Sequence, residues 1–205
     1  MAVITISRQF GAGGRTLGKM IAEKLDYKFL DDVIIQAIAK EAKVSTSTVK
    51  SMERIAGGTL SKLFSGLINS NYIERLIGGG KGYLNEEIYL DVLNKVMNEL
   101  AEQDNVVLMG RGGQYILADF ENAYHLLLVS DVEHRIEFMK KYYNMNPEKA
   151  ADVIKIGEKK RTVLYKKMHK EDYNSPNHYH LTLNMSILSL EEALALVCSL
   201  VSAHP

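Results

Sequence analysis

The sequence predicts an α/β protein with a parallel sheet that is covered by helices on both faces. Short apolar, β-branched segments alternate with amphipathic segments along the whole chain, which is the pattern of strands joined by crossover helices. Three of the predicted strands end in glycine-rich or acidic residues. A length of 205 residues fits one large domain, and hydrophobic residues make up 46% of it, which is enough for a packed core.

The chain opens with a strand and a helix. Residues 3–6 are apolar and mostly β-branched, as expected of a strand that is buried on both faces. Glycines follow at once, and then Leu17, Met20, Ile21 and Leu25 recur at the spacing of one helix face. The sequence therefore predicts a glycine-rich turn between the first strand and the first helix.

A second short strand ends in two carboxylates, Asp31 and Asp32. Asp32 is a suitable N-cap for the next helix, predicted over residues 34–43, and this leaves Asp31 as the better candidate for binding. Another helix is predicted over residues 46–55, with Ser45 as its N-cap.

Residues 56–83 differ in composition, because glycine clusters at both ends bracket a moderately apolar stretch. Such glycines suit an element that moves relative to the rest of the protein, and they suit two ordinary loops equally well. The α/β alternation then continues with a helix at 84–102, strands at 105–109 and 123–129, helices at 131–143 and 146–172, a strand at 179–185 and a last helix capped by Ser189.

Composition and charge exclude several classes of function. Lys+Arg and Asp+Glu both number 25, so the formal net charge is zero and no global field attracts nucleic acid or anionic lipid. No apolar run approaches the roughly 18 residues of a membrane helix, and the first residues do not resemble a signal peptide. Cys198 is the single cysteine, which fits a reducing compartment. We therefore expect a cytoplasmic protein without nucleic-acid or membrane partners.

The segment from Ser7 to Thr16 has the composition of an anion-binding turn. Glycine-rich turns between a strand and a helix can direct backbone N–H groups at a phosphate, and the helix N-terminus adds its positive dipole end. The candidate phosphate-binding residues are Arg8, Gly11, Ala12, Gly13, Gly14, Arg15 and Thr16. This interpretation requires the amides between Phe10 and Thr16 to be available to an anion; a tight turn without a ligand is the alternative.

Five segments, taken in order, resemble the cytidylate kinase-like family of P-loop proteins. They are residues 3–17 with their Gly-Ala-Gly turn, residues 27–32, the glycine–arginine motif at 106–111, residues 158–161 with Tyr165, and residues 179–184 with Ser186. The resemblance implies a P-loop NTPase three-layer sandwich with a five-stranded parallel sheet of order 2-3-1-4-5. It also implies a single domain over residues 1–205, with a mobile helical acceptor-side region at 33–104 and a lid-like region at 145–178.

The turn departs from the standard phosphate loop, which reads G-x-x-x-x-G-K-[ST]. With Gly13 as the second glycine, Arg8 stands at the first glycine position and Gly14 at the lysine position. Thr16 lies one residue beyond the expected hydroxyl. The positive charge therefore falls to Arg8 and Arg15, since arginine can bind phosphate oxygens bidentately.

On the acceptor side, the resemblance implies that Arg111 binds the monophosphate of the acceptor. Its flanking glycines would leave the side chain free to reach into the cleft, and a surface ion pair is the alternative. Gly112 stands where the family has an aspartate that reads cytosine, and Gln36 and Ala37 stand where it has a tyrosine and an arginine. The sequence therefore gives only weak support to cytidine as the base.

Three arginines are expected at the reacting phosphates. Arg15, Arg135 and Arg161 are the candidate catalytic residues, because cationic side chains stabilise the charge that phosphoryl transfer spreads over oxygens. Arg161 matches the lid arginine of the family. Glu158 stands at an aspartate position of the lid and is assigned to substrate binding together with Asp31. For the lysines near Arg161, a solvated helix face is the alternative.

Two functions follow from these residues. The first is a nucleoside-monophosphate-kinase-like transferase that moves the γ-phosphoryl of ATP to a small acceptor, with CMP or dCMP implied by the resemblance and Mg²⁺ bound at Thr16. The second is a nucleotide-binding or sensing protein that lost the phosphate-loop lysine and does not catalyse. A homodimer through the helices at 45–76 and 84–102 is compatible with both.

Overall fold

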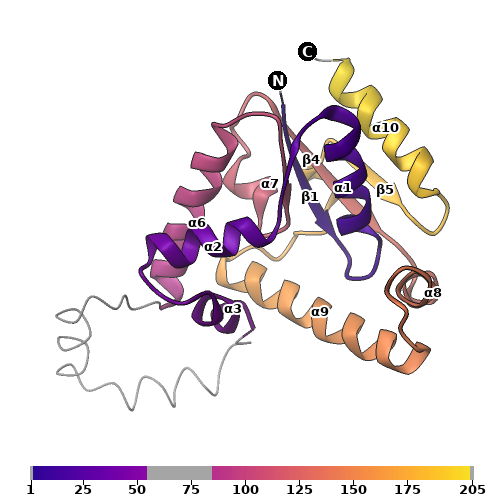
Figure 1. Cartoon of the computed structure of the whole chain (residues 1–205), viewed down its shortest axis with the longest axis horizontal. Coiled ribbons are helices and arrows are strands. Elements are labelled where there is room, and N and C mark those ends of the chain that lie inside the picture. Colours follow the sequence, from indigo (N-terminus) through magenta and orange to yellow (C-terminus); the bar gives the residue numbers. More distant parts are fainter. Residues whose placement is uncertain (1, 55–84, 204–205) are drawn as a thin grey trace.

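A five-stranded parallel sheet in the order β2-β3-β1-β4-β5 forms the centre of the protein and confirms the predicted fold class and strand order. The structure, a computed structural model, describes residues 2–54 and 85–203 (Figure 1). The strands are β1 (Val3–Arg8), β2 (Lys28–Leu30), β3 (Val106–Met109), β4 (Ala123–Val129) and β5 (Leu181–Asn184). The helices are α1 (Gly14–Leu25), α2 (Asp32–Glu41), α3 (Thr46–Arg54), α6 (Glu86–Ala101), α7 (Gly113–Ile116), α8 (Val132–Tyr143), α9 (Pro147–Lys167), the 3₁₀ helix η1 (Pro176–His178) and α10 (Leu190–Ser202).

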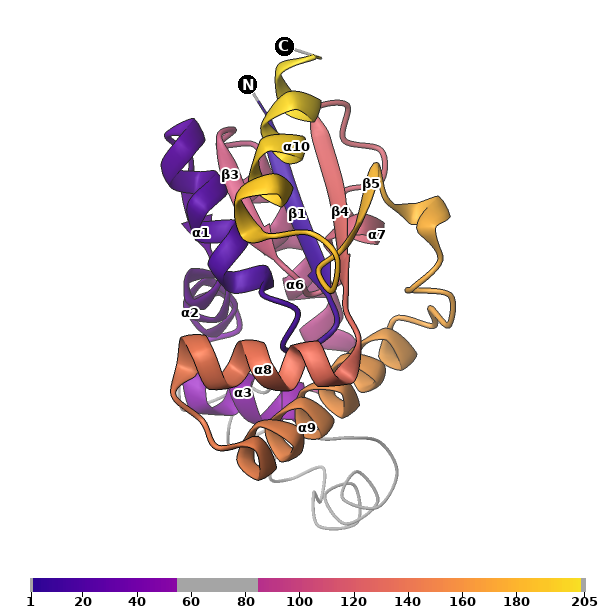
Figure 2. The same cartoon turned by 90° about the vertical axis from the view of Figure 1, so that its right-hand side faces the viewer.

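Different helices cover the two faces of the sheet, because successive side chains of a strand point to opposite faces. Ile4 and Ile6 of β1 pack with α1 and α10, whereas Val3 packs on the other face with α2 and α6. In Figure 2, α10 lies in front of the strands and α7 behind them. The central position of β1, with both faces covered, explains why its residues 3–7 are all buried.

The loops that leave β1, β2 and β3 meet at one edge of the sheet, as the sequence predicted. Ile6 of β1 lies beside Met109 of β3, and Leu30 of β2 lies beside Leu108. Helix α9 crosses below this edge in both Figure 1 and Figure 2. The glycine-rich turn, the acidic end of β2 and the glycine–arginine motif therefore lie together under α9.

Two predicted helix caps are confirmed. The Oγ atom of Ser45 accepts the N–H of Thr48 at 3.1 Å, and Ser189 forms a capping box with Glu192. The glycine-bracketed segment at 56–83 lies outside the described residues. No helix among residues 2–54 and 85–203 is long and apolar enough to cross a bilayer.

The predicted cap at Asp32 is wrong. Asp31 occupies the N-cap position of α2 without a side-chain hydrogen bond to the helix, and Asp32 is the first helical residue. The helix thus begins earlier than its apolar pattern indicated. An ion pair of 3.1 Å to Arg15 holds the Asp32 carboxylate instead.

Other boundaries also differ from the sequence pattern. Helix α9 ends at Lys167 rather than near residue 172, because His169 has a left-handed backbone with φ of 54°. Because the pattern of lysines and glutamates continues past this point, the end of the helix could not be predicted from it. Helices α7 and η1 were not predicted, since elements of this length give no periodic signal.

A buried histidine connects the two central strands. The Oγ1 atom of Thr5 lies 2.8 Å from Nδ1 of His125, and the amide of His125 donates to Nδ1 of His180 at 3.0 Å. Burial, reinforced by the neighbouring His180, lowers the pKa of His125 from 6.5 to about 4. The folded protein therefore holds His125 neutral over a range in which an exposed histidine takes up a proton.

We therefore expect acid to destabilise the protein as the pH falls from about 6.5 to about 4. In this range the unfolded chain binds a proton that folded His125 does not, so the free energy of unfolding decreases, by about 3 kcal/mol in total. Urea unfolding at neutral pH and at the acid end of this range measures the loss. The variant His125→Asn, which keeps a polar atom near the Nδ1 position, should lose this part of the pH dependence. An unchanged pH dependence in the variant would assign the loss to other groups.

Candidate phosphate-binding site

The turn between β1 and α1 has the backbone shape of an anion cradle. Gly11 and Gly13 have left-handed backbones, with φ of 89° and 82°, which explains glycine at both positions. Gly13 is the N-cap of α1 and offers no side chain to the helix. The first turn of α1 therefore presents its N–H groups without a side-chain acceptor.

Most amides of this turn have no acceptor within the described residues. In the two exceptions, Ala12 donates to the carbonyl of Gln9 at 3.1 Å and Phe10 donates to the carboxylate of Glu158. Within residues 2–54 and 85–203, the amides without an acceptor are those of Gly11, Gly13, Gly14, Arg15 and Thr16. Gly13 and Gly14 are buried as residues, and backbone N–H groups in proteins almost always bind a protein group, a water or a ligand. The start of α1 is therefore available to an anion.

The side chain of Arg8 runs from the first turn of α1 to the end of β3. A Cβ atom on Gly14 would lie 2.9 Å from Cγ of Arg8, and one on Gly110 would overlap its Nη1. Glycine at these two positions makes room for the arginine. The stem of Arg8 therefore fills the space next to the position where a standard phosphate loop has its lysine.

The guanidinium of Arg8 has no hydrogen bond or ion pair to any described residue. Burial lowers its pKa; nearby Arg111 and Arg161 lower it further, while Asp31 opposes them. Arginine remains protonated in such surroundings because its intrinsic pKa is very high. The structure thus holds a charged side chain beside the phosphate turn, and no carboxylate of residues 2–54 or 85–203 is directly bound to it.

Arg15, the other candidate for the role of the lysine, has a different environment. Its side chain is 46% exposed and forms ion pairs with Asp31 at 3.5 Å and with Asp32 at 3.1 Å. Two carboxylates therefore already share its charge. Of the two arginines, Arg8 is better placed to bind a phosphate at the turn.

Arg111 is held more tightly than its flanking glycines suggested. Its Nε donates to Glu53 of α3 at 2.9 Å, and its Nη1 lies 3.3 Å from a carboxylate oxygen of Asp31 and 3.3 Å from the carbonyl of Met109. Burial opposes its charge, but Glu53 and Asp31 outweigh that effect and raise the pKa. Arg111 is therefore ion-paired rather than free, as in the alternative interpretation, although the pairs are buried instead of at the surface. No local pattern indicates that Glu53 would reach this arginine.

A cavity of about 180 Å³ lies between the end of β1 and helix α9. Its lining combines side chains from the turn, from the acidic end of β2, from α3, from the glycine–arginine motif and from α9. It brings together four predicted site residues: Arg8, Asp31, Arg111 and Arg161. Arg15 and Thr16 do not line it. The cavity therefore unites the acceptor-side candidates, with Arg8 connecting them to the phosphate turn.

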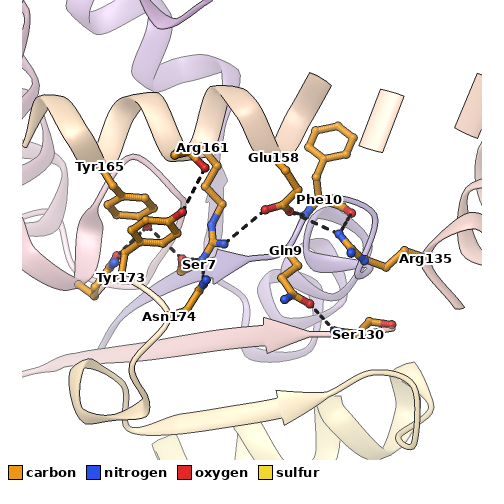
Figure 3. A network of polar contacts seen from close by, with 12 residues as sticks. Ser7, Gln9, Phe10, Ser130, Arg135, Glu158, Arg161, Tyr165, Tyr173 and Asn174 are labelled. Atoms are coloured by element: carbon orange, nitrogen blue, oxygen red, sulfur yellow. Dashed lines mark hydrogen bonds and ion pairs between the residues drawn. The ribbon is translucent and has the colours of Figure 1, made fainter. Parts of the chain in front are cut away.

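Beside this cavity, Glu158 of α9 lies between two predicted catalytic arginines (Figure 3). Its Oε1 accepts the amide of Phe10 and lies 3.5 Å from Nη1 of Arg135, and its Oε2 lies 3.7 Å from Nη1 of Arg161. Arg135 also donates to the carbonyl of Phe10 at 3.3 Å. The turn, α8 and α9 are thus joined by one carboxylate.

Tyrosines position Arg161 from the other side. The ring of Tyr173 stacks on Tyr165 at 4.3 Å between centroids, and the guanidinium of Arg161 lies 4.9 Å from the Tyr173 ring (Figure 3). Arg161 also donates to Asn174 at 2.7 Å, while the hydroxyl of Tyr165 lies 3.1 Å from Oγ of Ser7. Sequence reasoning missed Tyr173 and Asn174. They follow α9, just beyond the point near residue 172 where the helix was predicted to end.

A second cavity, of about 400 Å³, lies on the other side of the turn, between α8 and the segment that follows β5. Phe138 and Tyr142 of α8 are stacked in its wall, with 4.3 Å between ring centroids. A Cβ atom on Gly13 would lie 3.1 Å from the Phe138 ring, so the aromatic wall directly adjoins the phosphate turn. Such a wall suits a flat aromatic group whose phosphates reach the start of α1.

The residues present fit a magnesium ion only in part. Thr16 lies in the first turn of α1 and is partly exposed. No group of three or more His, Cys, Asp or Glu residues suited to a metal occurs among residues 2–54 and 85–203. Magnesium in phosphate sites takes few protein ligands and several from the phosphates, so one hydroxyl is compatible with it.

The parallel sheet and the glycine turn before α1 define a P-loop protein with a kinase-like fold. A solved structure of an uncharacterized protein from Eubacterium ventriosum ATCC 27560 shares 14% identity and a TM-score of 0.68, with 100% of both chains covered. Shikimate kinase from Bacteroides thetaiotaomicron shares 17% identity and a TM-score of 0.50, with 98% of both chains covered. A gluconokinase from Sinorhizobium meliloti 1021 shares 15% identity and a TM-score of 0.50, with 98% of this chain and 94% of the other covered.

The chain belongs to the cytidylate kinase-like family, whose sequence pattern matches residues 3–187. A comparison with curated proteins gives no match. The solved structures are too distant in sequence to show more than the fold.

Proposed function

We propose that the protein is a phosphotransferase that moves the γ-phosphoryl group of ATP to a small acceptor. The observation that carries this proposal concerns Gly13, Gly14 and Arg8: within residues 2–54 and 85–203, the amides of the two buried glycines have no acceptor, and the guanidinium of Arg8 beside them has no hydrogen bond or ion pair. Together these groups provide the hydrogen-bond donors and the positive charge that bind a phosphate. Membership of the cytidylate kinase-like family supports the same reading.

In this proposal the donor nucleotide lies across the turn. The amides at the start of α1 bind its phosphates, and Arg8 supplies the charge that lysine supplies in a standard phosphate loop. The aromatic wall formed by Phe138 and Tyr142 takes the base in the cavity of about 400 Å³. Magnesium, held by Thr16 and the phosphates, would neutralise charge on the donor.

The acceptor lies in the cavity of about 180 Å³ under α9. Arg111 and Arg161 bind its anionic group, and Asp31 orients the acceptor. Arg135 and Arg161 stabilise the negative charge on the transferring group, so that positioning and electrostatics provide the acceleration. By family resemblance the acceptor is CMP or dCMP. Shikimate and gluconate, the substrates named for two proteins of similar fold, are alternatives to test.

The second candidate is a nucleotide-binding protein that does not catalyse. Two observations favour it: Gly14 stands at the lysine position, and Glu53 and Asp31 already pair with the presumed acceptor arginine, Arg111. In that case ATP binds at the turn and no acceptor is phosphorylated. Cytoplasmic location and a homodimer remain proposals under both candidates.

A turnover assay with a panel of acceptors separates the two candidates. Purified protein is mixed with ATP, Mg²⁺ and each nucleoside monophosphate, shikimate or gluconate, and ADP release and product mass are measured. We expect ADP release that depends on one acceptor class, together with an ATP-dependent rise in melting temperature. ATP binding without any phosphorylated product would establish the sensor. A melting temperature that ATP does not change would reject both.

A further inference from the structure

We propose that the protein has a second phosphoryl-binding site, formed by the amide of Phe10 and by the side chains of Arg135 and Arg161. The carboxylate of Glu158 occupies this site in the structure, and a phosphoryl group of the bound nucleotide displaces it. The proposal rests on the proposed function, because it places this site beside the phosphate turn. It adds an internal competitor, Glu158, that the protein must displace in order to bind polyphosphate.

The carboxylate of Glu158 is surrounded by donors that suit a phosphate. One oxygen accepts the N–H of Phe10 and faces Arg135 at 3.5 Å, while the other faces Arg161 at 3.7 Å (Figure 3). One backbone amide and two guanidinium groups around an anion is the donor set that proteins use for phosphate. The carboxylate therefore occupies a place with the chemistry of a phosphate site.

The single carboxylate of Glu158 leaves several N–H donors of Arg135 and Arg161 without a hydrogen bond in the described part of the chain. The side chains of Arg135 and Arg161 are only 9% and 11% exposed. Nε of Arg135, together with Nε and Nη1 of Arg161, is buried without a hydrogen-bond partner in the described part of the chain. Buried donors without an acceptor are costly. A phosphoryl group has more oxygens than a carboxylate and carries more charge, so it can satisfy donors that Glu158 leaves unpaired.

Helix α9 packs closely against the phosphate turn at Gly157. A Cβ atom on Gly157 would overlap the Phe10 ring, so α9 can approach the turn this closely only because residue 157 is glycine. The neighbouring Glu158 then reaches the Phe10 amide. The close packing of α9 against the turn therefore places Glu158 in the site. A phosphoryl group that takes the site must move the Glu158 side chain, and α9 adjusts with it.

The test compares tripolyphosphate binding to the full-length wild type, Glu158→Gln and Glu148→Gln by isothermal titration calorimetry at one ionic strength. Gln keeps the shape of Glu158 and an acceptor for the Phe10 amide, but it removes the competing charge. We expect Glu158→Gln to bind tripolyphosphate about tenfold more tightly, the size expected for losing a charged hydrogen-bond competitor. Glu148 is exposed on the same helix, about three turns away, and its variant should bind like the wild type.

A double variant makes the result specific to this site. In Glu158→Gln with Arg135→Gln, one cation of the proposed site is absent, so the tighter binding should largely disappear. Unchanged or weaker binding by Glu158→Gln alone would overturn the proposal, and weaker binding would mean that Glu158 contacts the ligand directly. Tighter binding without phosphorylation of any acceptor would uphold this site while rejecting the phosphotransferase.

Discussion

Replacing Arg8 with methionine should lower the rate of phosphoryl transfer by about 100- to 1,000-fold. Arg8 is the cation that lies beside the free amides of α1, and no anion among the described residues is bound to it, so its charge is available to the phosphates. Methionine keeps most of the length of the stem between Gly14 and Gly110. The rate is measured with the acceptor identified in the panel, under saturating ATP.

The same variant should fold as well as the wild type. Burial lowers the pKa of Arg8, which means that the folded state disfavours its charge. Removing that charge should leave the free energy of unfolding unchanged or raise it by up to about 1 kcal/mol. Lys28→Met is the matched control, because Lys28 is exposed at the opposite end of the sheet and its loss should leave the rate unchanged. A variant at Arg8 that unfolds, or one that keeps its full rate, would contradict the role proposed here.

Introducing the missing lysine should damage the protein rather than improve it. In Gly14→Lys the new Cβ atom would lie 2.9 Å from Cγ of Arg8, at the rigid base of that side chain. Such overpacking should cost about 1–3 kcal/mol of stability and displace Arg8 from the site. We therefore expect a lower melting temperature and a rate reduced by about tenfold or more, in line with the loss of one charged contact.

Removing the obstruction should reverse part of this loss. The double variant Arg8→Gly with Gly14→Lys restores the spacing G-x-x-x-x-G-K of the standard phosphate loop. It should recover the melting temperature and turn over faster than Gly14→Lys alone. A single variant Gly14→Lys that is more active than the wild type would show that Arg8 does not act in place of the lysine.

The main elements of the fold could be predicted from local patterns in the sequence. The buried strand at Val3–Arg8, the glycine turn and the long helix at Glu86–Ala101 each have a period or composition that decides their structure within a few residues. Boundaries were predicted less well where polar residues continue past the end of a helix. The end of α9 is such a case, since the pattern of charged residues does not indicate the left-handed backbone of His169.

The candidate site could be predicted only in part. Glycines after a strand indicated a phosphate turn, because left-handed backbone and close approach both require glycine at Gly11 and Gly13. The partners of the charged side chains could not be predicted. Glu53 and Glu158 come from helices far along the chain, and no local rule indicates which arginine each would meet.

The sequence by itself determined the order of strands and helices and the presence of a turn suited to anions, because periodicity and glycine placement act over a few neighbouring residues. Only the tertiary structure decided which charges are available. Arg15 and Arg8 are equal candidates in the sequence, yet packing gives Arg15 two carboxylates, whereas Arg8 pairs with none in the part of the chain that the structure describes. The physical reason is that Coulomb and hydrogen-bond interactions depend on distance in space, and residues that lie far apart along the chain set that distance.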